Sequence, residues 1–218
     1  MIVMKTDPLL PDVDSVSIAA EAVRRGDLII FPTETVYGLA ANAVDVRAVQ
    51  KIFEAKGRKP DHPLPVQILN ADMLDTVAMD VPESARILAR HFWPGPLTMI
   101  LRRNEKLPDI VTAGGATVGV RVPDHAVALK LLEMVRLPIV ATSANVSGGE
   151  APTTAGEAIE AVGQWVSVAL DSGPARIGVA STVVDISDGT PRILRAGSIG
   201  MDRILAVLEE GTQCEDNY

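Results

Sequence analysis

The chain has 218 residues, of which 47% are hydrophobic and 3% aromatic, so it is long enough for one sizeable core built mainly from Val, Ile, Leu and Ala. A formal charge of −8 argues against a broad basic face for nucleic acid, but it allows a local basic cluster. The single cysteine, Cys214, excludes an intrachain disulfide, and the sequence has neither a secretory h-region nor an uninterrupted apolar run of about 18 residues. These features predict one cytoplasmic domain over residues 1–218, without a membrane segment.

Helices are expected where apolar residues recur at intervals of three and four between a capping residue and a stop signal, and strands where apolar runs are short or alternate. In chain order, the first half predicts a helix between Asp14 or Ser15 and Gly26, a strand over 28–31, a helix from the Asp45 cap to Gly57, a strand over 64–69, a helix that begins at Pro82, a turn at 93–96 and a strand over 97–102. The second half predicts a strand over 117–122, a helix capped by Asp124, a strand over 138–142, a helix over 155–162 with Thr154 and Glu157 as a capping box, strands near 166–170, 181–186 and 192–195, a last helix over about 199–209 and a polar tail over 210–218. Helices and strands interleave, but several strands follow one another directly, which predicts an α/β fold with a mixed sheet.

Polar side chains follow the first expected strand and the second expected helix. Thr33 and Glu34 present a hydroxyl and a carboxylate at a strand end, an arrangement that a capped turn explains equally well. Lys56 and Arg58 lie two residues apart beyond a helix end. In an extended segment both side chains point to the same side, where both could reach one anion. The alternative for this basic cluster is a solvated loop.

Two further segments place polar groups beside strands. Alternation puts Thr117, Gly119 and Arg121 on one face of a strand, opposite two valines, which predicts a lined cleft on that face. Loop 142–149 offers hydroxyls, an amide and two glycines directly after an apolar strand, which is the usual position of a ligand loop in α/β proteins. Ordinary turn chemistry also favours these residues.

Several common signatures are missing from the sequence. It contains neither a G-x-x-x-x-G-K-[ST] loop nor a G-x-G-x-x-G turn, so any phosphate must be bound by another device. His62, His91 and His125 are scattered without zinc-type spacing, and no G-x-S-x-G elbow supports a Ser/His/Asp triad. We therefore expect no dedicated structural metal.

Six segments occur together in the order and spacing of a known family: FPTETVYGL, the K-x-R of Lys56 and Arg58, WPGPLT, VGVRVP, the S-x-N of Ser143 and Asn145, and ASTVVDI with ILRAGSI near the end. Through them the chain resembles the YrdC-like threonylcarbamoyl-AMP synthases, from about residue 12 to about 208. The resemblance implies a three-layer α/β fold with a twisted mixed sheet and a concave, locally positive cleft.

The resemblance also implies a reaction, in which L-threonine, bicarbonate and ATP become threonylcarbamoyl-AMP and pyrophosphate. Mg²⁺ is expected to accompany ATP, and a downstream threonylcarbamoyl-transferase complex would modify the adenosine next to the anticodon of tRNA. A weak direct contact with tRNA or double-stranded RNA is allowed for. By position, the resemblance assigns ATP binding to Lys56, Arg58, Thr117, Ser143, Asn145 and Arg195, threonine binding to Thr33, Arg121 and Ser181, and catalysis to Lys56 and Arg58. Among these, Arg121 suits a bidentate hold on the threonine carboxylate.

The sequence departs from the family pattern at Gln67, where many members have a histidine in the strand after the K-x-R loop. An amide donates and accepts hydrogen bonds but cannot become a cation. We also expect the chain to lack the additional C-terminal domain of longer members. Two rival functions share the fold: a noncatalytic or differently active paralogue that binds double-stranded RNA or tRNA, and a carbamoyl-transfer domain like those of hydrogenase-maturation proteins. The lack of fused acylphosphatase-like or zinc-finger segments disfavours the second rival.

Overall fold

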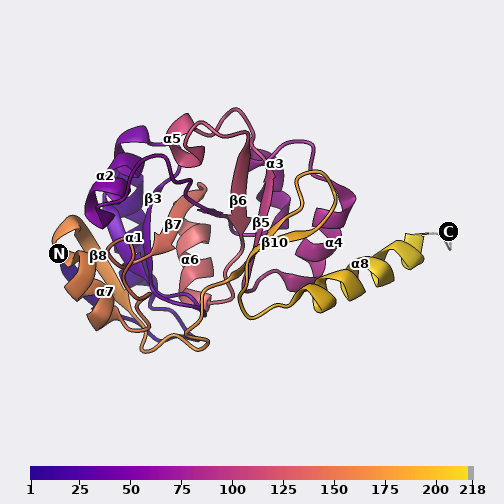
Figure 1. The fold of residues 1–218 in the computed structure, drawn as a ribbon. Coiled ribbons are helices and arrows are strands. Elements are labelled where there is room, and N and C mark those ends of the chain that lie inside the picture. Colours follow the sequence, from indigo (N-terminus) through magenta and orange to yellow (C-terminus); the bar gives the residue numbers. More distant parts are fainter. Residues whose placement is uncertain (216–218) are drawn as a thin grey trace.

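The computed structural model describes the backbone of residues 1–215 and the side chains of residues 1–211. Within that part of the chain, the strands are β1 (Ile2–Lys5), β2 (Leu28–Phe31), β3 (Gly38–Asn42), β4 (Val66–Gln67), β5 (Leu97–Arg102), β6 (Thr117–Arg121), β7 (Ile139–Ser143), β8 (Val166–Asp171), β9 (Thr182–Asp185) and β10 (Arg192–Arg195). The α-helices are α1 (Val13–Arg24), α2 (Val46–Lys56), α3 (Leu74–Val77), α4 (Glu83–Phe92), α5 (Asp109–Thr112), α6 (Ala126–Val135), α7 (Ala155–Val162) and α8 (Met201–Glu215). Short 3₁₀ turns, η1 (Ala71–Met73) and η2 (Gly163–Trp165), precede α3 and β8. Figure 1 shows how the helices and strands are arranged.

The strands form one mixed sheet, as the interleaved pattern predicts. Its strand order is β1-β8-β2-β3-β7-β4-β6-β5-β9-β10. The pairs β1–β8, β2–β8, β4–β6 and β5–β9 are parallel, whereas β2–β3, β3–β7, β4–β7, β5–β6 and β9–β10 are antiparallel. Strands that follow one another directly, such as β2 and β3, pair antiparallel, while parallel neighbours need a longer crossover between them.

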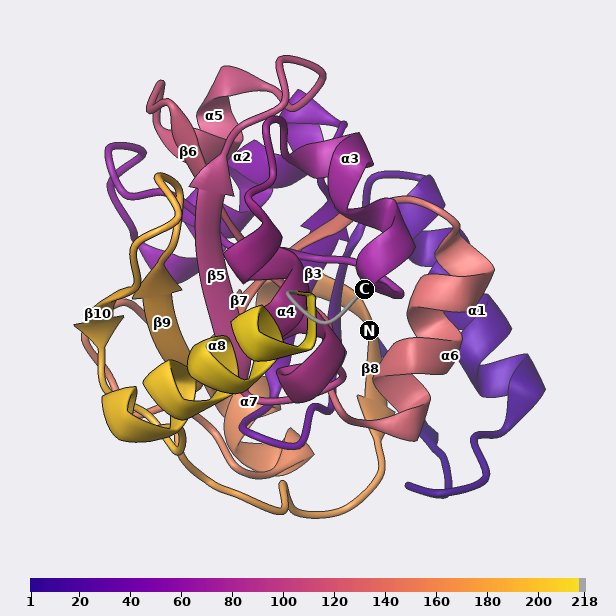
Figure 2. The same cartoon turned by 90° about the vertical axis from the view of Figure 1, so that its right-hand side faces the viewer.

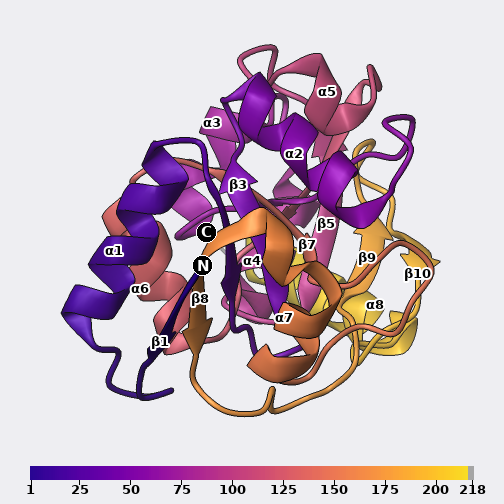
Figure 3. The ribbon, with the colours of Figure 1, turned by 90° about the vertical axis from the view of Figure 1, so that its left-hand side faces the viewer.

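Helices flank the sheet on both faces. In β2, Ile29 and Phe31 pack with α1 and α6 on one face, whereas Leu28 and Ile30 belong to a larger core that includes α2, α4 and α7 on the other. α1 and α6 lie side by side in both turned views (Figure 2, Figure 3). A strand buried on both faces reads as the continuous apolar run seen at 28–31, and the expected helix–sheet–helix layering is confirmed.

Local signals start and stop several helices at the predicted residues. Asp45 accepts hydrogen bonds from the N–H groups of Arg47 and Ala48 at the start of α2, and Gly57 ends that helix in the left-handed conformation with φ of 56°. Thr154 and Glu157 form the predicted capping box at the start of α7. Such signals act within one turn of the chain, so they can be read without knowledge of the fold.

Other predicted boundaries are wrong. α6 is capped by His125, whose Nδ1 accepts from the N–H of Val127, because Asp124 instead pairs with Arg176 at 2.6 Å. α1 is capped by Asp12 rather than by Asp14 or Ser15.

Further differences concern the lengths of elements. Pro82 precedes α4 as its capping residue, and β4 is limited to Val66–Gln67 within the expected strand 64–69. α8 continues to Glu215, so the expected polar tail is helical over 210–215. Residues 216–218 and the side chain of Cys214 lie outside the described part of the chain.

Two strands, β1 and β3, have no counterpart among the expected elements. β3 has the sequence GLAAN, in which Gly, Ala and Asn are depleted in strands, yet it lies fully buried between β2 and β7. β1 is an exposed edge strand that pairs with β8. Among residues 1–215, no helix is long and apolar enough to cross a membrane.

Candidate active site

A cavity of about 300 Å³ lies on one face of the sheet. Its floor consists of alternate residues of β5 and β6 together with Val183 of β9, which face the same side in the strand register. Ala141 of β7 borders both this cavity and the core beneath α1 and α6. The cavity therefore lies beside these two helices, on the face of the sheet that they share.

Strand β6 supplies the polar floor that alternation predicts. Thr117, Gly119 and Arg121 line the cavity, whereas Val118 and Val120 point into the core on the opposite face. A Cβ added at Gly119 would lie 3.2 Å from Ile100 Cδ1 and 3.3 Å from Thr98 Cγ2. The missing side chain therefore keeps this part of the floor open.

Most residues assigned by the resemblance meet at this cavity, although they come from segments far apart in the sequence. The lining includes Thr33, Arg58, Thr117, Arg121, Ser143, Ser181 and Arg195. Lys56 and Asn145 are not in the lining. None of the lining residues, all within the described chain, is acidic. A cavity with this composition favours an anionic ligand.

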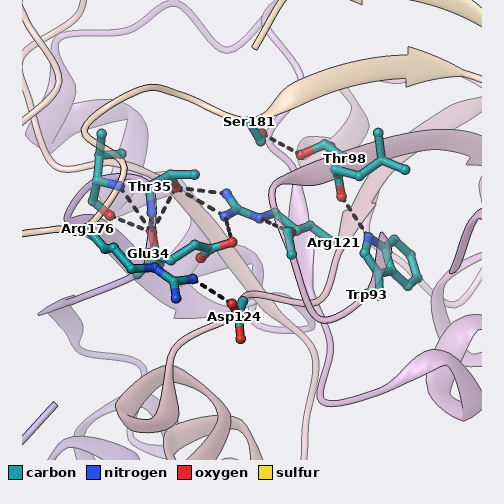
Figure 4. Close-up of polar contacts among 12 residues, drawn as sticks. Glu34, Thr35, Trp93, Thr98, Arg121, Asp124, Arg176 and Ser181 are labelled. Atoms are coloured by element: carbon teal, nitrogen blue, oxygen red, sulfur yellow. Dashed lines mark hydrogen bonds and ion pairs between the residues drawn. The ribbon is translucent and has the colours of Figure 1, made fainter. Parts of the chain in front are cut away.

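Arg121 is held by a buried ion pair (Figure 4). Its Nη2 donates to Glu34 Oε1 at 2.7 Å, and the two side chains are 8% and 1% exposed, respectively. Its Nε donates to the carbonyl of Gly95, and Nη1 and Nη2 both donate to the Thr35 hydroxyl, each at 3.1 Å. These bonds leave only one N–H, on Nη1, for a ligand. A bidentate hold on a carboxylate therefore requires Thr35 to release a bond.

The segment after β2 is a tight turn that also lines the cavity. Thr33 Oγ1 donates to the carbonyl of Val36 at 2.6 Å and lies 2.9 Å from Thr35 Oγ1. The second carboxylate oxygen of Glu34 is buried without a hydrogen-bond partner, and its backbone carbonyl accepts from the N–H of Ile177 at 2.8 Å. Thr33 therefore forms hydrogen bonds within the turn and also lines the cavity.

Ser181 lies in a cluster that joins the floor to β10. Its hydroxyl is 2.8 Å from Thr98 Oγ1 (Figure 4), and Arg195 Nη2 donates to it at 3.0 Å. Arg195 also donates from Nε to the carbonyl of Ser181 at 3.1 Å. Burial, and to a lesser extent the charge of Arg121, lowers the pKa of Arg195. Ser181, assigned to threonine binding, and Arg195, assigned to ATP binding, thus belong to one hydrogen-bonded cluster.

Lys56 and Arg58 do not project together from an extended segment, which corrects the expectation for the K-x-R pair. Lys56 is the last residue of α2, and the left-handed Gly57 turns the backbone between the two residues. Lys56 is 2% exposed, and its Nζ donates to the carbonyls of Ser143 and Asn145. Burial, followed by the charge of Arg58, lowers the pKa of Lys56 to about 8. Lys56 is therefore not placed to reach the same anion as Arg58.

Arg58 does line the cavity. Its Nη2 donates to the carbonyl of Pro63 at 3.2 Å, and its Nε is buried without a hydrogen-bond partner. Burial lowers the pKa of this guanidinium. A buried donor without a partner costs free energy, so an anionic acceptor that reaches this guanidinium would be favoured.

Among the lining residues without a binding role assigned from the sequence are Thr35, Thr98 and Gln67. Gln67 is 6% exposed, and its Oε1 has no hydrogen-bond partner. Strand alternation contains the signal for two of them, because Gln67 pairs in register with Arg121 and Thr98 precedes the core residue Met99. Thr35 lies in the turn between β2 and β3, so strand alternation gives no signal for it.

The structure is a mixed α/β sheet with three arginines and several hydroxyls around one cavity, a lining whose chemistry suits a small anionic ligand. Residues 21–197 match the Sua5_yciO_yrdC family model, which is described as telomere recombination. The match covers more than half of the chain, and the chain belongs to this family. The resemblance identified from the motifs is confirmed.

Named relatives in this family are similar over most of the chain. The threonylcarbamoyl-AMP synthase of Pyrococcus abyssi is 47% identical over 195 residues, which are 89% of this chain and 57% of the relative. That of Bacillus subtilis is 44% identical over 204 residues, or 93% of this chain and 59% of the relative. A crystal structure of P. abyssi Sua5 complexed with L-threonine matches with a TM-score of 0.92 and 44% identity, over 95% of this chain and 61% of that one. The chain thus spans less than two thirds of the length of these relatives.

Proposed function

We propose that this chain forms threonylcarbamoyl-AMP from L-threonine, bicarbonate and ATP, with release of pyrophosphate. The observation that carries the proposal is the convergence of Thr33, Arg58, Arg121, Ser181 and Arg195 on one cavity. Relatives named threonylcarbamoyl-AMP synthase, at 44% and 47% identity, support the same reaction. So does the L-threonine bound to P. abyssi Sua5.

In this proposal, the amino acid binds against the floor of the cavity. The threonine carboxylate accepts the free Nη1 N–H of Arg121, and the hydroxyls of Thr33 and Ser181 contact its other polar groups. Because Glu34 neutralises Arg121, this arginine contributes orientation more than net attraction. The unpartnered Oε1 of Gln67 offers a further acceptor to the amino acid, and an amide keeps this role at every physiological pH.

The triphosphate of ATP is proposed to contact Arg58 and Arg195. Arg58 presents a buried, unpartnered Nε, so an anionic phosphate oxygen would satisfy a donor that otherwise costs free energy. The hydroxyls of Thr117 and Ser143 line the same cavity and complete the nucleotide side. Mg²⁺ enters as part of the Mg–ATP substrate, held by the phosphates.

The mechanism requires alignment and charge stabilisation rather than a covalent enzyme intermediate. The threonine amine adds to CO₂ derived from bicarbonate and loses a proton to give a carbamate. A carbamate oxygen then forms a bond to the α-phosphorus while the bond from that phosphorus to the pyrophosphate oxygen breaks. Arg58 and Arg195 stabilise the charge that develops on the phosphates, and Arg121 fixes the attacking amino acid.

The proposed product determines what must follow it. Threonylcarbamoyl-AMP is a mixed anhydride, so its carbonyl carbon is activated for transfer to a nucleophile with AMP as leaving group. We propose that a threonylcarbamoyl-transferase complex consumes it in the cytoplasm and modifies tRNA next to the anticodon.

The test is pyrophosphate release measured with L-threonine, bicarbonate and Mg–ATP, and with each omitted in turn. We expect release only when all are present, and we expect Arg58→Gln to reduce the rate at least about 100-fold. Arg90→Gln is the matched control, because Arg90 is a surface residue of α4 whose side chain is 61% exposed. Release that continues without threonine, or an unaltered rate in Arg58→Gln, would contradict the proposal. RNA binding with steep salt dependence and no turnover would instead indicate the RNA-binding paralogue.

A further inference from the structure

Lys56 is a buried cation whose donors all face one loop. Its Nζ lies 2.5 Å from the carbonyl oxygen of Ser143, 2.5 Å from that of Asn145 and 3.4 Å from Asn145 Oδ1. An ammonium group has three N–H donors, so these oxygens account for all of them. The side chain is 2% exposed and does not line the cavity. No donor of Lys56 is therefore free for a phosphate.

The loop from Ser143 to Gly149 is closed on itself around this contact. Asn145 Nδ2 donates to the carbonyls of Val146 and Gly149, each at 2.8 Å. The N–H of Ser147 donates to the carbonyl of Lys56 at 2.9 Å, so side chain and backbone of the same residue hold the loop. At one end of this loop, Ser143 lines the cavity.

The charge of Lys56 is balanced by carbonyl dipoles, since no carboxylate is among its partners. Without the ammonium group, two carbonyl oxygens would converge on one point with no donor between them. Unsatisfied buried acceptors cost about 1–3 kcal/mol each, so the loop would move to find other partners. The position of Ser143 in the cavity thus depends on a residue outside the cavity.

We propose that Lys56 is a positioning residue that fixes the loop from Ser143 to Gly149, and that it does not itself contact phosphate. The proposal rests on the proposed function only in taking the ligand of this loop to be a nucleotide. The contribution of Lys56 to binding is then the same for every nucleotide that contacts the loop, whatever its number of phosphates. Arg58, which lines the cavity, contributes more to ATP than to AMP because its contribution follows phosphate charge.

The experiment compares Lys56→Met with Arg58→Met, each of which removes one positive charge. Equilibrium dissociation constants for Mg–ATP and for AMP are measured by calorimetry. We expect Lys56→Met to weaken both ligands by the same factor, about tenfold, and Arg58→Met to weaken ATP several-fold more than AMP. A loss in Lys56→Met that is confined to ATP would overturn the proposal.

A second readout needs no ligand. Amide hydrogen exchange in the loop from Ser143 to Gly149 should be at least about tenfold faster in Lys56→Met and unchanged in Arg58→Met. Unchanged exchange in Lys56→Met would overturn the proposal whether or not a nucleotide binds. Failure of both nucleotides to bind the wild-type protein would count against the proposed function alone. If Lys56→Met does not fold, Asn145→Ala tests the same point, because it removes two bonds within the loop and should weaken ATP and AMP equally.

Discussion

The buried pair between Glu34 and Arg121 gives the sharpest prediction about stability. Glu34→Gln removes a charge of −1 beside a guanidinium 2.7 Å away, where the side chains are 1% and 8% exposed. Removal of one partner of a buried pair costs about 3–5 kcal/mol, because it leaves an uncompensated charge. Arg121 keeps its bonds to Gly95 and Thr35 and borders the cavity, so we expect the lower end of that range.

The free energy of unfolding should be measured by urea denaturation at pH 7. We expect Glu34→Gln to lower it by about 3 kcal/mol, whereas Glu133→Gln, which breaks the exposed pair with Lys130, should change it by less than about 1 kcal/mol. The double variant Glu34→Gln with Arg121→Gln should lose about 2 kcal/mol less than the sum of the single variants. A loss below about 1 kcal/mol in Glu34→Gln, or strictly additive losses, would contradict a stabilising ion pair between Glu34 and Arg121.

Three further predictions concern the floor, the helix cap and pH. Gly119→Val should weaken L-threonine binding at least about tenfold in calorimetry, because even an added Cβ would lie 3.2 Å from Ile100 Cδ1 and the valine methyl groups would fill the floor. Unchanged affinity would contradict the placement of the amino acid on this floor. Thr154→Ala should cost about 1 kcal/mol in urea denaturation through loss of the capping box, with pyrophosphate release unchanged, and a loss of activity would contradict a purely structural role. Wild-type ATP affinity should fall above about pH 8, where Lys56 loses a donor, and Lys56→Met should not show this fall. The free energy of unfolding changes in the opposite direction. Lys56 has a pKa of about 8 in the folded chain and the ordinary pKa of 10.5 in the unfolded chain. Between these two pH values the unfolded chain binds more protons, so the contribution of Lys56 to the free energy of unfolding rises with pH.

Elements with local signals could be predicted from the sequence, and elements without them could not. α7 lies where its capping box places it, and α2 ends at the glycine that the pattern indicates. β3 has no strand-like composition and owes its conformation to pairing with β2 and β7, which the sequence does not reveal. Asp124 is a good capping residue in isolation, but its pairing with Arg176, 52 residues away, leaves that role to His125.

The site residues also divide into those with a local sequence signal and those placed only by tertiary contacts. Alternation along one strand was enough to place Thr117 and Arg121 on one face, because the period of a strand does not depend on its neighbours. The role of Lys56 was not predictable from spacing, because it depends on the backbone turn at Gly57 and on contacts with a loop 87 residues away. The Glu34 partner of Arg121 also comes from tertiary structure, since the two residues lie 87 positions apart.

The most direct test of the central claim is product analysis with ¹³C-labelled bicarbonate, L-threonine and Mg–ATP. We expect a new adenylated product that carries the ¹³C carbonyl bonded to the threonine nitrogen, with one pyrophosphate released per product. We also expect that Arg121→Gln abolishes this product while the protein still folds and binds ATP. Formation of AMP without incorporation of the label, or label incorporation that does not require threonine, would contradict the claim that an amino acid and a nucleotide meet in this cavity.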